Sequence, residues 1–274
     1  MLIEFLPQSF TAAKLPHGTP IPEGEFVFFS RTDSENSLIC PTENMPTAVT
    51  DREDGWCGMR IVGQLDFSLL GILARIAAVL AEAEVGILAL STYDTDYIFV
   101  KLENSARAKE ALLCAGYEIR ADGVEIGFGT PEEICSWMSL VRDVRSNFPG
   151  LETEEALAAH RRTVEKFINR RTAIRAKADG RIIGVLLFSP NRNLLCCMAV
   201  DPAYRRRHIA QDMFALMRSV ADSERELTVS TFRENDPLGI APRAFYEKMG
   251  FRPDELTEEC GYPVQKFIRP AEKQ

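Results

Sequence analysis

The sequence lacks the features that mark membrane, disulfide-bonded and zinc-binding proteins. Its longest apolar stretch, residues 69–81, is interrupted by Arg75 and is too short to span a bilayer. The seven cysteines are scattered and form no Cys-x-x-Cys pair, which argues against a disulfide framework and a metal site. Residues 1–10 include Glu4 and Pro7 and lack the basic start and apolar run of a signal peptide. We therefore expect a cytoplasmic protein without a metal or a membrane partner.

Positive charge is also scarce, and it is unevenly distributed. Residues 1–123 carry 9 Lys and Arg against 18 Asp and Glu, whereas residues 124–274 carry 23 against 22. So acidic a first half argues against nucleic acid as a partner. The asymmetry also indicates a domain boundary, and a length of 274 residues suits two globular domains. We place these domains at residues 1–122 and 123–274.

The first half has the pattern strand, helix, strand, strand, helix, which is typical of a split βαβ fold. Ser105 is expected to cap the second helix, and Gly116 to end it. The expected strands are residues 26–29, 37–40, 59–62, 85–90 and 97–100, and the expected helices are residues 69–80 and 105–115.

Two stretches of this half carry a family resemblance. Residues 64–74 read Gln-Leu-Asp-Phe-Ser-Leu-Leu-Gly-Ile-Leu-Ala, and residues 90–100 read Leu-Ser-Thr-Tyr-Asp-Thr-Asp-Tyr-Ile-Phe-Val. Together they resemble the ACT domain, in the variant of the CASTOR-type amino-acid sensors. Residues 35–41 resemble the strand that these tandem-ACT proteins place beside their ligand. The resemblance covers residues 1–120 approximately and implies a tandem ACT-like domain with the ferredoxin-like βαββαβ fold.

The resemblance implies that this domain binds a free amino acid. The start of a helix at Gly71 would offer backbone N–H groups to the carboxylate of the ligand, and Asp96 would meet its ammonium group. Leu69 stands where arginine-sensing relatives carry an acid, so we expect an uncharged amino acid. The pocket residues implied by the resemblance are Ser37, Leu38, Asp66, Gly71, Ile72, Thr92, Tyr93, Thr95 and Asp96.

Structural roles are open alternatives for these residues. Gly71 can serve the helix start alone, and Asp94 and Asp96 can be turn residues that bond the local backbone. The whole domain can also act only as a dimerisation module. Because ACT domains often pair, a homodimer is expected.

In the second half, two helices precede a run of strands. Thr130 followed by Pro131 opens the first helix, and Asp179-Gly180 indicates a hairpin between two strands. The expected helices are residues 130–146, 153–169, 208–221 and 242–249; the expected strands are residues 124–128, 172–177, 181–188, 193–200 and 226–232, with two more at the end.

The junction at residues 198–211 carries the strongest chemical signal. A strand ends there, Asp201-Pro202 turns the chain, and three consecutive arginines lead into a helix. Unpaired backbone N–H groups, a helix dipole and cationic side chains converge, which is what a pyrophosphate requires. About forty residues later, residues 241–251 read Ala-Pro-Arg-Ala-Phe-Tyr-Glu-Lys-Met-Gly-Phe.

These two segments resemble the GNAT N-acetyltransferase superfamily over about 150 residues, which implies a mixed sheet and acetyl-CoA as the acyl donor. By that resemblance the backbone of Met198, Ala199 and Val200 would hold the pantetheine arm, and Tyr246 would protonate the departing thiolate. An N–H at the strand edge near Val200 would polarise the thioester carbonyl. The pyrophosphate would lie against residues Arg205, Arg206, Arg207, His208, Ile209, Ala210 and Gln211.

The sequence departs from the family pattern in three respects, one of which is that the usual Asn before the Tyr is not at its expected spacing, where residues 236–239 resemble a small insertion. His208 replaces the first Gly of the Arg/Gln-x-x-Gly-x-Gly/Ala signature, where it can crowd the phosphate, bind it when protonated, or have a structural role. Residues 193–200 contain no acid to deprotonate an amine, so Glu234, Asp236, a water chain or no base at all remain alternatives. Tyr246 can also be a core residue. Cys196 and Cys197 have no histidine partner in the sequence, and we interpret them as packing residues.

The sequence thus predicts an α/β protein in which an ACT-like regulatory domain precedes a GNAT domain. Its expected activity is transfer of an acetyl group from acetyl-CoA to an amine, either a small molecule or a protein lysine, tuned by the free amino acid. The alternative is a non-catalytic sensor of acyl-CoA and amino acid that acts through a protein partner.

Overall fold

The computed structural model describes residues 1–63, 71–145, 148–259 and 261–272. The chain divides into two compact units, one formed by Met1–Leu112 and Ile119–Asp122, the other by Leu113–Glu118 and Gly123–Gln274. In the described part of the chain, no helix is long and apolar enough to cross a membrane. Each unit is a mixed α/β structure, so the predicted fold class is confirmed.

The first unit is built on a twisted sheet with strand order β7-β1-β4-β6-β5, and the short strand β2 pairs with β3, which pairs with β1. Its elements are β1 (Leu2–Leu15), β2 (Phe28–Arg31), β3 (Asn36–Pro41), β4 (Asp51–Ile61), α1 (Ile72–Glu82), β5 (Ile87–Ser91), β6 (Asp96–Lys101), α2 (Ser105–Cys114) and β7 (Glu118–Ala121). The run from β4 to β7 is one βαββαβ motif, and β1 lies between its first and last strands.

The two faces of this sheet bury different side chains because residues alternate along a strand. On one side of α1, Ile72, Ile76 and Leu80 recur every four residues and are buried. On the opposite face of β6, the ring of Phe99 packs edge-to-face on Phe10 at 5.1 Å between centroids. A Cβ at position 58 of β4 would come within 2.9 Å of the Phe10 ring, so this close packing requires Gly58.

Several local expectations for this unit were wrong. The strand expected at residues 26–29 begins instead at Phe28, because Phe26 adopts a positive φ of 59° in the preceding turn. Ser105 does not cap α2: it already has helical dihedral angles, and its hydroxyl donates to the carbonyl of Leu102 in a preceding 3-10 turn. The residues before position 71 in the helix expected at 69–80 lie outside the described residues.

The second unit has a seven-stranded sheet in the order β13-β14-β12-β11-β10-β9-β8. Its elements are β8 (Val124–Phe128), α3 (Ile134–Asp143), α4 (Glu154–Asn169), β9 (Ala173–Ala178), β10 (Arg181–Ser189), β11 (Leu194–Val200), α5 (Ile209–Arg218), β12 (Leu227–Phe232), α6 (Ile240–Lys248), β13 (Arg252–Glu259) and β14 (Tyr262–Arg269). The helix expected at residues 130–146 is shorter, because a 3-10 turn takes residues 131–133 and α3 ends at Asp143.

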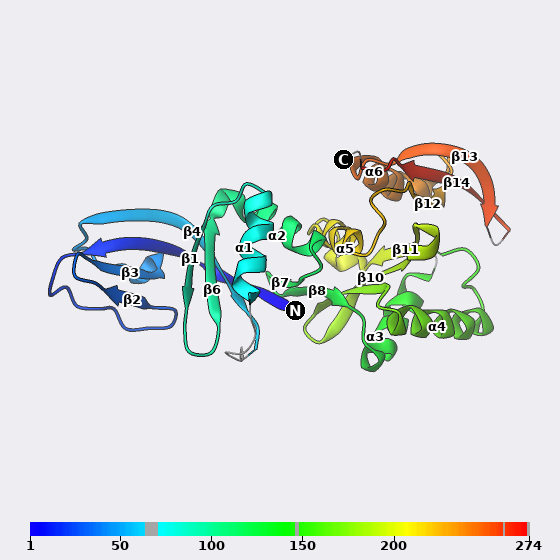
Figure 1. The fold of residues 1–274 in the computed structure, drawn as a ribbon. Helices are drawn as coiled ribbons and strands as arrows, with labels where there is room; N and C mark the ends of the chain where they lie inside the picture. Colours follow the sequence, from blue (N-terminus) through cyan, green and yellow to red (C-terminus); the bar gives the residue numbers. More distant parts are fainter. Residues whose placement is uncertain (64–70, 146–147, 260, 273–274) are drawn as a thin grey trace. The chain divides into compact units, whose positions relative to one another are not determined.

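Helices cover both faces of this sheet (Figure 1). On one face, Trp137 of α3 and Val164 of α4 join a buried cluster with Ile182, Val185 and Leu187 of β10. On the other face lies α5, and a Cβ at Gly184 of β10 would come within about 3 Å of the Met213 side chain. The layers hold β10 and β11 rigidly at the centre of the unit, where the site is formed.

Candidate functional site

The site begins where two parallel strands separate. The strands β11 and β12 pair only at Leu194 with Thr228 and at Leu195 with Val229. Beyond that point β11 continues to Val200 paired with β10, and β12 continues to Phe232 paired with β14. The two strands therefore form a fork, and one backbone edge of β11 is open along its second half.

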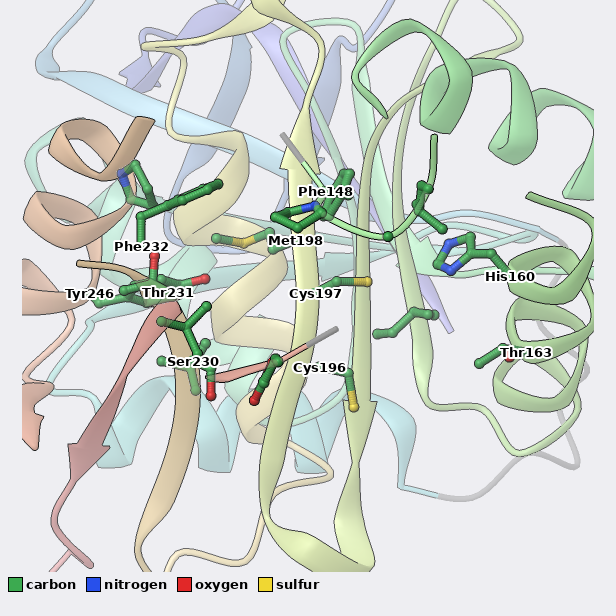
Figure 2. A pocket seen from close by; sticks show the side chains of 18 of the residues that line it. Phe148, His160, Thr163, Cys196, Cys197, Met198, Ser230, Thr231, Phe232 and Tyr246 are labelled. Carbon is green, nitrogen blue, oxygen red and sulfur yellow. The ribbon is translucent and has the colours of Figure 1, made fainter. Parts of the chain in front are cut away.

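A cavity of about 440 Å³ occupies this fork (Figure 2). Its walls come from β10 to β12, from α4 and the segment before it, from α6, and from β13 and β14. The polar or reactive side chains of the lining are His160, Thr163, Cys196, Cys197, Ser230, Thr231, Tyr246 and Glu259.

Tyr246 is the sequence-predicted catalytic residue, and it lines this cavity from α6. Its side chain is 6% exposed, and its ring packs against Phe251 at 5.6 Å and Phe267 at 6.4 Å between centroids. Burial, with a smaller contribution from Cys197, raises the pKa of the Tyr246 phenol. The phenol therefore keeps its proton at neutral pH and is available as a hydrogen-bond donor or as an acid.

The neighbouring thiol is not poised as a nucleophile. Burial, with a smaller contribution from Cys196, raises the pKa of Cys197 to about 12. A thiol with such a pKa is almost wholly protonated at neutral pH, and the thiolate is the reactive form. The expected packing role of Cys197 agrees with its contacts, since it packs against the core cluster beneath α3 and α4.

A second hollow of about 410 Å³ lies at the start of α5. It is lined by Val200, Tyr204, Arg205, Arg206, His208, Ile209, Ala210, Gln211, Phe245 and Lys248. Most of the residues expected to meet a pyrophosphate are thus together, and Lys248 is a cation that the sequence interpretation omitted. Arg207 differs, since its guanidinium lies over the Tyr204 ring at 5.5 Å.

The open edge of β11 connects the two hollows. Met198 lines the cavity in the fork, Val200 lines the hollow at α5, and Ala199 between them packs on the core. Helix α6 is shared in the same way, because Phe245 lines the second hollow and Tyr246 the first. A long, thin ligand along residues 198–200 would therefore have one end beside Tyr246 and the other beside the arginines.

His208 occupies a backbone position suited to glycine. Its φ of 59° and ψ of 6° are left-handed, and it forms the N-cap of α5. Its carbonyl accepts the N–H of Asp212, and its Nδ1 lies 3.3 Å from Oε1 of Gln211. Where the family signature has glycine, this chain therefore has the His208 side chain at the edge of the hollow, and the backbone of His208 is strained.

Two further residues of the cavity lining, His160 and Glu259, were not predicted from the sequence. His160, Thr163 and Phe167 follow an i, i+3, i+7 spacing on α4, beside the buried stripe of the same helix, so they face the cavity together. Burial lowers the pKa of His160, so its imidazole is neutral at pH 7 and can accept a proton. That helical spacing was the signal available in the sequence.

The two acids considered from the sequence lie elsewhere. Glu234 is exposed, and Asp236 accepts hydrogen bonds from the Tyr262 hydroxyl at 2.5 Å and the Leu238 N–H at 2.9 Å. Asp236 therefore caps a 3-10 turn before α6. Neither of the two acids lines the described cavity walls.

In the first unit, the structure assembles only part of the predicted effector site. Thr95 Oγ1 donates to the carbonyl of Ile61 at 2.8 Å, and Thr92 Oγ1 donates to the carbonyl of Thr95 at 2.8 Å. These bonds fix the β5–β6 turn against the end of β4. Asp96 accepts a hydrogen bond from Ser91 at 2.6 Å, and Tyr93 is 78% exposed at the tip of the turn.

Gly71 has a positive φ of 72° as the N-cap of α1, and Ile72 after it is buried. Asp66 and Leu69 lie outside the described residues. Ser37 and Leu38 do not join the turn residues: they pair with Lys14 and Ala13 of β1, which pair with residues 51 and 52 at the start of β4. The turn bonds Ile61 at the other end of that strand, roughly 30 Å away along an extended backbone.

Comparisons with known proteins identify both domains. Residues 51–113 match the model of an ACT domain, and residues 169–253 match the model of a GNAT acetyltransferase domain. The chain therefore combines these two domains, as predicted from the resemblance. No protein of the curated set matches the sequence.

Solved structures resemble about half of the chain each. A protein from Agobacterium tumefaciens is 28% identical, with a TM-score of 0.40, over 43% of this chain and 90% of its own. A GNAT-family acetyltransferase from Bacillus cereus is 18% identical, with a TM-score of 0.42, over 55% and 99%. The PaiA N-acetyltransferase of Thermoplasma acidophilum, solved with coenzyme A, is 17% identical, with a TM-score of 0.39, over 52% and 97%.

Proposed function

Because the chain combines an ACT domain with a GNAT acetyltransferase domain, it is an acyltransferase, and we propose that it transfers acetyl from acetyl-CoA to an amine under the control of a free amino acid. The observation that carries the proposal is the fork between β11 and β12. It places a buried phenol beside the open edge of β11 and a cationic hollow at the far end of that edge.

The two hollows fit the two ends of acetyl-CoA. The pyrophosphate lies against the start of α5, where Arg205, Arg206 and Lys248 supply positive charge and the first turn of the helix supplies N–H groups. The pantetheine arm follows the backbone of residues 198–200, and the thioester lies in the fork cavity. An N–H of the open edge near Val200 stabilises the charge that develops on the carbonyl oxygen.

The transfer is direct, from thioester to amine. An ammonium group that enters the cavity loses one proton to His160, and the free amine attacks the thioester carbon. The C–N bond forms, the C–S bond breaks, and Tyr246 gives its proton to the departing thiolate. The nitrogen releases its second proton as the amide forms, which balances the proton that Tyr246 regains from solvent. The protonated state of Cys197 argues against a covalent acyl-cysteine intermediate.

The effector site is proposed at the end of β4, where Thr95 of the Thr92–Asp96 turn bonds the Ile61 carbonyl, and Gly71 and Ile72 at the start of α1 are assigned to the same site. The N–H groups at the start of α1 receive the carboxylate of an uncharged amino acid, and Asp96 receives its ammonium group. Ser37 and Leu38 are not part of this proposed site. A change of affinity or rate by this ligand requires only about 1–3 kcal/mol of coupling.

The test has a binding arm and a turnover arm. Thermal unfolding of the full-length protein is measured with acetyl-CoA and, separately, with each common amino acid; a ligand at about 100 times its Kd stabilises by about 2.7 kcal/mol. Release of coenzyme A thiol is then followed with a broad panel of amines and peptides. If acetyl-CoA binds but no acceptor is acetylated, the proposed acetyl transfer is wrong and a non-catalytic sensor is the better interpretation. If acetyl-CoA raises the unfolding temperature and no amino acid does, the ACT domain is a structural or dimerisation module.

A further inference from the structure

One side of the fork cavity is not accounted for by the acyl donor. Tyr246 and Thr231 line the cavity from α6 and β12, whereas His160 and Thr163 line it from α4 on another side (Figure 2). On the α4 side the chain adds two apolar walls, Phe148 and Leu151 from the segment before α4 and Phe167 from the helix itself. An acetyl group needs none of this apolar surface, so it is available to the body of the acceptor.

The charges of the lining restrict what that acceptor can carry. Among the described residues that line the cavity, Glu259 is the one carboxylate, and there is no Lys or Arg. Glu259 is an exposed residue at the end of β13, so it meets a ligand at the entrance of the cavity. A carboxylate on the ligand would have to leave water where no Lys or Arg belongs to the described lining and where this acid lies near, which is unfavourable.

We propose that the acceptor is a small primary amine with an aromatic or branched aliphatic body and no carboxylate. Glu259 attracts its ammonium group at the entrance, the apolar walls hold its body, and His160 lies within the same cavity to take its proton. This inference rests on the proposed acetyl transfer and identifies its acceptor class. A lysine of a protein presents only an unbranched stem to the cavity, so most of the aromatic wall would stay uncovered.

The experiment uses matched pairs of acceptors with the full-length protein at saturating acetyl-CoA. Phenethylamine is compared with phenylalanine, isopentylamine with leucine, and both amines with a lysine-containing peptide, by release of coenzyme A thiol and mass of the product. We expect kcat/KM for each amine to exceed that of its amino acid by about tenfold or more. Equal or higher kcat/KM for the amino acids or the peptide overturns the acceptor class and leaves acetyl transfer standing. No turnover on any of them, with acetyl-CoA bound, overturns the transfer itself and this inference with it.

Charge variants test the same inference by another route. Glu259→Gln is expected to raise KM for the apolar amines about tenfold while KM for acetyl-CoA is unchanged, and Glu259→Lys is expected to shift the preference toward the amino acids. Glu258→Gln is the matched control, since it removes the same charge one residue earlier on β13 and Glu258 does not line the cavity. Equal effects of the variants at positions 258 and 259 would contradict a specific role for Glu259.

Discussion

Asn193 clamps the backbone of Asp222 on both sides: its Oδ1 accepts the Asp222 N–H at 3.0 Å, and its Nδ2 donates to the Asp222 carbonyl at 2.9 Å. The same Nδ2 reaches the carbonyls of Arg225 and Glu226 just before β12. Asn193 is fully buried and has a positive φ of 46°. One side chain thus joins the start of β11 to the chain that enters β12 and fixes the point from which the fork opens.

Removal of this amide is expected to destabilise the second unit. Asn193→Gly keeps a residue that tolerates the positive φ but removes the side-chain partner of backbone groups in Asp222, Arg225 and Glu226, so we expect a loss of about 1–3 kcal/mol in the free energy of unfolding. Urea unfolding measures it, and KM for acetyl-CoA should rise in parallel because the fork loses its fixed origin. The control is Asn191→Gly, an exposed position in the preceding turn. Similar losses for both variants would show that the clamp contributes nothing specific.

Tyr246→Phe separates catalysis from binding. The substitution keeps the ring that packs on Phe251 and removes only the hydroxyl, so folding and acetyl-CoA affinity should change little. If the hydroxyl protonates the leaving thiolate, kcat falls by about 10²- to 10⁴-fold. Steady-state kinetics and calorimetric titration of acetyl-CoA check the two parts. A kcat within a few-fold of the parent protein would return Tyr246 to the role of a core residue.

The backbone at His208 predicts a preference for glycine over alanine. A side chain in the left-handed region costs about 1–2 kcal/mol, and glycine avoids this cost. His208→Gly should therefore be more stable than His208→Ala by about 1 kcal/mol in thermal unfolding, the reverse of the order in a helix interior. If His208 also crowds the phosphate, the glycine variant binds acetyl-CoA more tightly than the parent protein. If both variants bind acetyl-CoA more weakly than the parent protein, the His208 side chain contributes to phosphate binding.

The elements that the sequence predicted well have a regular pattern and a clear end. Helix α4 begins at Glu154, within one residue of the expected start, and the side chain of its N-cap Thr153 accepts the Ala156 N–H at 3.1 Å. By contrast, β1 was not predicted, although it is a strand of 14 residues. Register shifts lie between Phe5 and Ser9 and again between Phe10 and Ala12, so its buried residues do not alternate and no period-2 signal is visible.

The candidate site divides in the same way. Most of the hollow at α5 could be predicted because its residues between Val200 and Gln211 lie in one short stretch of the chain, whereas Lys248 comes from α6 and was not predicted. For His160, the helical spacing indicates which side chains share a face of α4, but the sequence does not show that this face, or Glu259 of β13, meets the fork, because α4 and β13 approach it only through the packing of the whole unit. Ser37 and Leu38 were placed beside the effector turn by family likeness alone, and the β1–β4 register separates them from it.

The lowered pKa of His160 predicts a dependence of both stability and rate on pH. Burial disfavours the charged imidazole, so the folded protein binds its proton only below the ordinary value of 6.5. The unfolded state then binds more protons near that value, and stability falls as the pH drops from about 6.5 to the lower pKa of the folded protein. The kcat of the parent protein should decline over the same acidic range.

The variant His160→Gln should lower kcat by about 10²-fold or more, and its kcat should no longer decline in acid. The variant Arg162→Gln changes an exposed neighbour on α4, so it should keep the kcat of the parent protein and its decline in acid. If the kcat of His160→Gln still declines over the same acidic range, the decline is due to another group.

The last prediction distinguishes the two ends of β4 as the place of amino-acid binding. Thr95→Val keeps the shape of the side chain but removes the hydrogen bond to the Ile61 carbonyl, which positions the turn that carries Asp96. We expect the free energy of unfolding to fall by about 1 kcal/mol. We also expect the amino acid to lose its effect on the unfolding temperature, and this second result is the one that locates the site. Ser37→Ala removes a hydroxyl that donates to Glu35 at the other end of the strand, so it should keep the full shift. Both variants are measured with the same amino acid and with acetyl-CoA, whose shift reports that the second unit is intact. Loss of the amino-acid shift in Ser37→Ala and its survival in Thr95→Val would move the effector site to the start of β4, where Ser37 and Leu38 line a separate hollow with Lys14 and Arg52.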